Sequence, residues 1–186
     1  MVGNMGTNPD LLAEAVFDIA ATKGLDAASI REVAAAAGVS IGAVQYHFAT
    51  KDELYAFAFS QVIRRVEERL AKVDLEAGLE DRLVAVLSEL LPMDPARERE
   101  ARVMLGFAAR ATSHSLLAAT QRSTLDGIVA QLTEQLDAAG VDDAATRAVL
   151  LLAAVDGLTL DGLSSGDLDP DLMLRALRAQ VRLVLR

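Results

Sequence analysis

Hydrophobic residues recur at intervals of three and four along almost the whole chain, which is the period of helices that bury one face. The first such stripe consists of Leu12, Ala15, Val16, Ile19 and Ala20. No segment shows the strict alternation of apolar and polar residues that a half-buried strand needs, and β-branched runs are missing. The pattern therefore predicts an all-α protein.

Capping residues and glycines divide this pattern into about nine helices. At Asn8, Asp94 and Asp169 a side-chain acceptor stands directly before a proline, an arrangement that favours the first helical turn. Gly24 and Gly140 tolerate positive φ and end helices. The long helices after the first are expected to begin near residues 50, 79, 95, 114, 142 and 170.

Two short helices are expected between residues 29 and 48. Ser29 and Glu32 have the spacing of a capping box, which opens the first of them. Gly38 ends it, and Ser40 opens the next helix only two residues later. Helices joined so closely must cross steeply, as in a helix-turn-helix. We therefore predict a helix-turn-helix domain at residues 1–50 and a larger helical domain at residues 51–186.

The outward face of the second short helix carries side chains suited to DNA. Gln45 both donates and accepts hydrogen bonds, so it can read a base edge, and Tyr46 suits a phosphate or a thymine methyl. Gly42 permits close backbone approach, while His47 and Lys51 suit phosphate contacts. The candidate DNA-binding residues are Ser29, Ser40, Ile41, Gly42, Ala43, Gln45, Tyr46, His47 and Lys51.

Composition restricts the possible functions. The formal net charge is -9, and residues 1–56 hold three Lys or Arg against seven Asp or Glu, so bulk charge does not favour nucleic acid. No apolar run reaches the roughly 18 residues of a membrane span, and the first residues lack a secretory signal. We expect a cytoplasmic protein without membrane contact.

An all-helical enzyme is a poor fit to this composition. The chain has no cysteine, and its two histidines, His47 and His114, are 67 positions apart. Nucleophile–base pairs and metal-ligand clusters therefore lack their usual residues. We expect no catalysis, no metal and no cofactor.

The stretch from Ser29 to Leu54 strongly resembles the DNA-binding domain of the TetR/AcrR family of regulators. The resemblance is carried by Ser29, Val33-Ala34, Ala37-Gly38-Val39-Ser40, Gly42, Val44, Tyr46-His47-Phe48 and Lys51-Asp52-Glu53-Leu54. It implies that Gln45 and Tyr46 face the bases of a palindromic operator, and that His47 and Lys51 face its backbone. Two features depart from many family members: Gln45 replaces a tyrosine, and no basic segment precedes the first helix.

The run from Leu150 to Leu160 resembles the eighth helix of family members with a choline-regulator-type C-terminal domain. The resemblance implies a homodimer in which the last two helices pack against their twins. The residues expected at this interface are Leu151, Ala154, Val155, Leu158, Leu177 and Val181. Asp156, in the same apolar helix, has three open roles: pairing across the dimer, capping a neighbouring backbone group, or contacting the ligand. The C-terminal arginines, among them Arg175, Arg178 and Arg182, are expected to form a solvated face.

A pocket for an unknown small-molecule effector is expected in the helical domain. Met93, Met104 and Phe107 suit its wall or the plain core, and Arg110 and His114 are either exposed or orient a polar ligand. The favoured function is a dimeric repressor that its effector releases from the operator. The alternative is a helical small-molecule-binding or assembly module without operator binding.

Overall fold

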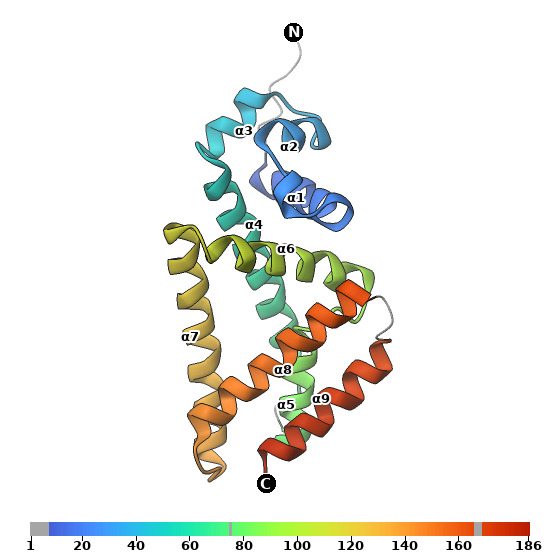
Figure 1. Cartoon of the computed structure of the whole chain (residues 1–186), viewed down its shortest axis with the longest axis vertical. Coiled ribbons are helices and arrows are strands. Elements are labelled where there is room, and N and C mark those ends of the chain that lie inside the picture. Colours follow the sequence, from blue (N-terminus) through green and yellow to red (C-terminus); the bar gives the residue numbers. More distant parts are fainter. Residues whose placement is uncertain (1–7, 75, 166–168) are drawn as a thin grey trace. The chain divides into compact units, whose positions relative to one another are not determined.

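The structure, a computed structural model, describes residues 8–74, 76–165 and 169–186. Over these residues the chain is helical and has no strand, which confirms the predicted all-α fold of about nine helices (Figure 1). The α-helices are α1 (Pro9–Lys23), α2 (Ile30–Ala36), α3 (Ile41–His47), α4 (Lys51–Leu70), α5 (Leu79–Ser88), α6 (Pro95–Ala111), α7 (Ser115–Ala138), α8 (Ala144–Ser165) and α9 (Pro170–Val184). A short 3-10 helix, η1 (Leu25–Ala27), follows α1 and was not predicted.

The predicted caps are present and explain where these helices begin. Ser29 Oγ accepts from Glu32 N (3.2 Å) and Ser40 Oγ accepts from Ala43 N (3.1 Å). Asp94 Oδ1 accepts from the backbone N–H groups of Ala96 and Arg97, both at 2.9 Å. Each acceptor satisfies an amide that has no partner inside its helix, so local sequence fixes the start of these helices.

The chain folds into two compact units. The described residues of 1–64 and 102–118 form the first unit, and those of 65–101 and 119–186 form the second. Helices α4, α6 and α7 therefore each contribute residues to both units. The predicted division of functions near residue 50 stays a prediction.

Aromatic residues fill the core of the first unit. Phe17, Tyr55, Phe59 and Phe107 are fully buried. Phe59 of α4 stacks on Phe107 of α6 with ring centroids 4.2 Å apart. This contact ties the second half of α6 to the helices at the start of the chain.

Aliphatic residues fill the core of the second unit. Helices α5, α7, α8 and α9 contribute a continuous buried cluster that includes Leu83, Leu136, Leu151 and Leu177. In the described part of the chain, no helix combines the length and the apolarity that crossing a membrane requires.

Candidate DNA-binding surface

Helices α2 and α3 form the predicted helix-turn-helix. Gly38, at φ +67°, ends α2 in a conformation that favours glycine, and Val39 N donates to Ala34 O at 2.9 Å. Val33, Ala34 and Val44 are buried, so the apolar faces of α2 and α3 pack against the rest of the first unit. The opposite face of α3 remains free.

That free face carries the side chains predicted to read DNA. Tyr46 is 86% exposed and Ile41 is 46% exposed, and Gln45 is also exposed. Because the Tyr46 ring is exposed, it adds no buried apolar area to the stability of the fold. A role in packing therefore does not account for a tyrosine at this position. The space beside Gly42 is open as well, because only Ser40 Oγ, at 3.9 Å, lies near the position of a Cβ. The surface suits a close approach by a large partner.

The remaining candidates on α2 and α3 are less exposed. His47 and Ala43 are half-buried, and the His47 ring meets the Tyr46 ring edge-on at 5.1 Å. The hydroxyls of Ser29 and Ser40 cap their helices, as described above. These residues shape the surface, and their contacts with DNA stay a prediction.

Lys51 makes an intramolecular contact that the sequence did not indicate. Its Nζ donates to Asp26 O at 2.6 Å and lies 5.1 Å from the centroid of the Tyr55 ring. Partial burial, together with the nearby Arg110 guanidinium, lowers the pKa of Lys51 from its ordinary value. The ammonium thus ties the start of α4 to η1, and its predicted phosphate contact stays a prediction.

Arg110, predicted near an effector pocket, forms ion pairs inside the first unit. Its guanidinium lies 2.8 Å from Asp26 Oδ1 and 3.3 Å from Asp52 Oδ1. It also lies 5.2 Å from the centroid of the Tyr55 ring, and its Nη2 is 3.4 Å from His114 Nε2. The side-chain hydrogen bond to Asp26 raises the pKa of Arg110 above its ordinary value. Arg110 therefore anchors α6 to η1 and to the start of α4.

This arrangement changes the charge of the DNA-binding part of the chain. Residues 1–64 and 102–118 contain six Lys or Arg and seven Asp or Glu, a formal net charge of -1. The acidity counted over residues 1–56 is thus largely balanced by Arg64 and by two arginines distant in sequence, Arg102 and Arg110. Sequence order alone hid this balance.

The other predicted pocket residues are divided between the two units, with Met93 in the second and Met104, Phe107 and His114 in the first. Phe107 belongs to the aromatic core of the first unit, while Met93 packs against the core of the second. An open cleft of about 290 Å³ lies instead in the second unit. Its lining consists of Arg69, Lys72, Val73, Glu89, Asp94 and Arg97. None of these residues was predicted, and whether an effector uses the cleft or the predicted residues stays open to experiment.

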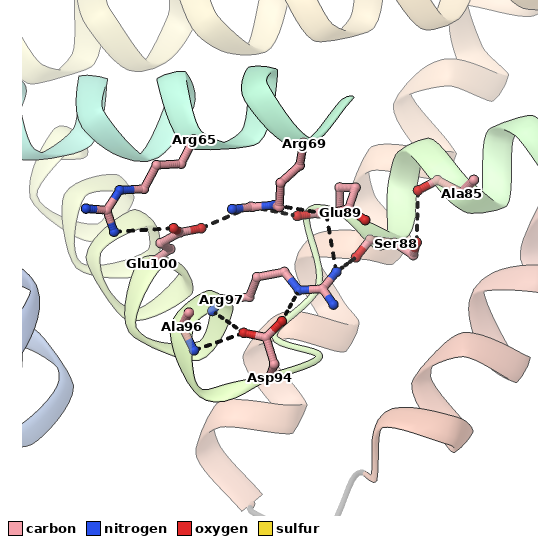
Figure 2. Close-up of polar contacts among 9 residues, drawn as sticks. All are labelled: Arg65, Arg69, Ala85, Ser88, Glu89, Asp94, Ala96, Arg97 and Glu100. Atoms are coloured by element: carbon pink, nitrogen blue, oxygen red, sulfur yellow. Dashed lines mark hydrogen bonds and ion pairs between the residues drawn. The ribbon is translucent and has the colours of Figure 1, made fainter. Parts of the chain in front are cut away.

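A network of ion pairs borders this cleft and joins three helices (Figure 2). Glu100 of α6 is only 4% exposed and lies 3.0 Å from Arg69 and 3.6 Å from Arg65, both on α4. Arg69 also binds Glu89, just after α5, at 2.9 Å, and Arg97 lies 3.4 Å from the same carboxylate. A buried carboxylate needs such partners, so the network fixes α4, α5 and α6 together within the second unit.

Four of the six residues predicted at the dimer interface are buried within a single copy of the chain. Leu151, Val155, Leu177 and Val181 are at most 2% exposed and belong to the core of the second unit. Their side chains have no surface to offer a partner, which corrects the prediction for these four. Ala154 and Leu158 are half-buried. The large apolar residues exposed on the same two helices are Val149, Leu150, Leu160, Leu172 and Leu183.

Arg178 and Arg182 lie at the surface, as predicted, and also form ion pairs that the sequence did not indicate. Arg178 lies 2.6 Å from Asp81 and 3.1 Å from Glu80, and Arg182 lies 2.8 Å from Glu80. Both arginines therefore hold α9 against α5. In the sequence, only the adjacent acids Glu80 and Asp81 hinted at an ion pair, and nothing there indicated which arginines bind them.

Comparison with known proteins places the chain among bacterial regulators. Residues 12–57 match the model of bacterial regulatory proteins of the tetR family, and residues 79–186 match the C-terminal domain of BetI-type transcriptional repressors. A solved transcriptional regulator from Rhodococcus sp. Rha1 is 47% identical, with 96% of each chain covered and a TM-score of 0.92.

Two further relatives differ in what they show. The HTH-type transcriptional regulator PksA of Bacillus subtilis (strain 168) is 31% identical, over 86% of this chain and 78% of its own. A regulator from Saccharomonospora viridis, solved in complex with choline, is 21% identical with a TM-score of 0.79. The alignment covers 94% of this chain and 95% of that one, and at this identity it shows the fold alone.

Proposed function

Because the chain belongs to the TetR family of bacterial transcriptional regulators, with a BetI-type C-terminal domain, we propose that it is a dimeric repressor released from its operator by a small-molecule effector. The observation that carries this proposal is the exposed face of α3. Gln45 and Tyr46 stand in water on a helix whose other face is buried, as a major-groove reading helix requires.

Two copies are needed for specific binding. One recognition helix reads only a few base pairs, whereas two helices about one DNA turn apart read a palindrome. The exposed apolar residues of α8 and α9 supply a surface that a second copy would cover, and apolar side chains in water favour such burial. A homodimer on a palindromic operator follows.

Effector control follows from the spacing of the two recognition helices. A ligand in the helical domain that favours a conformer with the wrong spacing lowers operator affinity by its differential affinity for the two conformers. The proposal therefore requires a small molecule that lowers the affinity of the protein for its operator, and whose own affinity is lowered when the operator is bound.

The test is a gel-shift measurement with DNA from upstream of the chain's own gene. Gln45→Ala with Tyr46→Ala is expected to abolish specific retardation, because both side chains that read bases are lost. The melting temperature is expected to stay unchanged, since both side chains are exposed. Lys23→Ala, exposed at the end of α1, is the matched control and should leave retardation intact.

Two results would count against the proposal. Undiminished specific binding by the double variant would show that α3 does not read the operator. No retardation by the unaltered protein even at low salt, where electrostatic contacts are strongest, would favour the helical module without operator binding.

A further inference from the structure

Helix α8 presents an exposed apolar stripe bordered by two carboxylates, Asp156 and Asp161. Val149, Leu150, Ala153 and Leu160 are exposed and lie on the face of α8 opposite the buried Leu151 and Val155. Asp156 is exposed on the edge of this stripe, one helical turn from Ala153 and from Leu160. In the part of the chain that the structure describes, no ion pair or hydrogen bond engages its carboxylate.

Helix α9 presents a similar stripe that contains one guanidinium. Leu172, Arg175, Ala179 and Leu183 are exposed at helical spacing. Whereas the neighbouring Arg178 is bound to Glu80 and Asp81, the Arg175 side chain has no ion pair with any described residue. Asp156 and Arg175 thus carry opposite charges, and neither has an ion-pair partner among the described residues.

Contacts between α8 and α9 show how far along the helix axes Asp156 and Arg175 lie from each other. Gly162 lies against Met173, with the Sδ atom 3.1 Å from the position of a Cβ, and the Arg147 guanidinium donates to Val184 O. The helices therefore run antiparallel and side by side, as Figure 1 shows. Between these two contacts, Asp156 and Arg175 fall within about one helical turn of the same level.

The two charges also lie away from the contact between α8 and α9. At about 100° per residue, Asp156 is roughly 120° around α8 from Gly162, and Arg175 is roughly 160° around α9 from Met173. Both therefore lie on the side of their helix that faces away from the other helix. They are poorly placed to meet each other within one copy of the chain.

We propose that Asp156 pairs with Arg175 of a second copy, and that this pair, made twice, selects the partner in the homodimer. A two-fold axis along the α8–α9 pair lays α8 of one copy over α9 of the other. It brings the outer edge of each helix to the same side of the interface. An arginine side chain is long enough to span the remaining offset. This inference rests on the proposed dimer and names the residues that fix its register.

Electrostatics supports the pairing. The surrounding protein already raises the pKa of Asp156 by removing water from its carboxylate. A second copy on this face would remove more water, and an interface tolerates a buried charge only when it is paired. A guanidinium gives the carboxylate a planar, two-pronged partner.

The test exchanges the charges and measures molar mass by sedimentation. Asp156→Arg places two like charges at each contact, and so does Arg175→Asp, so each variant alone is expected to dissociate at least tenfold more readily than the unaltered dimer. An equimolar mixture of the two variants has both contacts restored and is expected to form heterodimers. Glu134→Arg, an equal change of charge at an exposed position on α7, should leave the dimer unchanged.

The outcomes separate this inference from the proposed function. Variants that dimerise as tightly as the unaltered chain, or a mixture that stays monomeric, would overturn the pairing while leaving the dimer in place. An unaltered chain that sediments as a monomer would overturn both. Circular dichroism of each variant shows whether loss of the dimer reflects loss of the fold.

Discussion

At the scale of single residues, one close approach decides how α6 meets η1. A Cβ on Gly106 would lie 2.6 Å from Leu25 Cβ and 3.1 Å from Leu25 Cδ2. Leu25 Cβ is attached to the backbone, so it cannot swing aside as the end of a long side chain would. Glycine at this position therefore lets α6 pack directly on η1.

Gly106→Ala is expected to destabilise the protein. Overpacking costs about 1–3 kcal/mol, whereas alanine in place of glycine gains only about 1 kcal/mol of helix propensity. The net expectation is a loss of up to about 2 kcal/mol, measured by urea denaturation. Gly127→Ala on α7 meets nothing within 4 Å and should instead stabilise by up to about 1 kcal/mol. A gain at both positions would show that the approach of α6 relaxes freely.

At the scale of elements, Asp94 shows how a single cap positions a helix. Its carboxylate accepts two backbone amides at the start of α6 and binds Arg97 at 2.7 Å. The backbone hydrogen bond from Arg97 is the main reason that the pKa of Asp94 lies below its ordinary value. Arg97 also lies 3.4 Å from Glu89, so the start of α6 is fixed by local and long-range contacts together.

Asp94→Ala is expected to cost about 0.5–2 kcal/mol at pH 7, because the first turn of α6 loses its acceptor. The contribution depends on pH. Since the folded pKa lies below the unfolded value of about 3.9, the stabilisation is present above that pH and is lost as the pH falls through the folded pKa. Asp94→Asn keeps an acceptor but does not titrate. The difference between the unfolding midpoints of the unaltered protein and Asp94→Asn should shrink as the pH falls from about 7 to about 3, and a constant difference would contradict this assignment.

At the scale of the whole molecule, charge sets the balance between specific and non-specific binding. The chain carries a net charge of -9, and the first unit is close to neutral. Each copy therefore has few cations for phosphates, and base contacts must supply much of the operator affinity.

The expected consequence is a shallow dependence of operator binding on salt. With about one or two phosphates neutralised by each copy, the slope of log K against log salt concentration is about -2 to -4 for a dimer. Fluorescence anisotropy with labelled operator, measured between about 50 and 300 mM salt, gives this slope. A slope near -10, as expected for about ten neutralised phosphates, would show a cationic surface that this account does not contain.

The sequence by itself determined the helices and the exposed face of α3. The helical period, the caps at Ser29, Ser40 and Asp94, and the stop at Gly38 act over three or four residues, and such local signals survive in the folded chain. The exposure of Gln45 and Tyr46 follows from the same local pattern, because Val44 and Phe48 fix which face turns inward.

The tertiary structure alone decided which apolar and charged residues find partners. Leu151 and Leu177 carry the same apolar signal as Leu150 and Leu172, yet the first two are buried in one copy and the others are exposed. Arg110 and Arg178 could not be matched with Asp26 and Asp81 from spacing, since their partners are 84 and 97 residues away. Burial and ion pairing depend on how distant helices pack, and the amphipathic period of one helix does not contain that information.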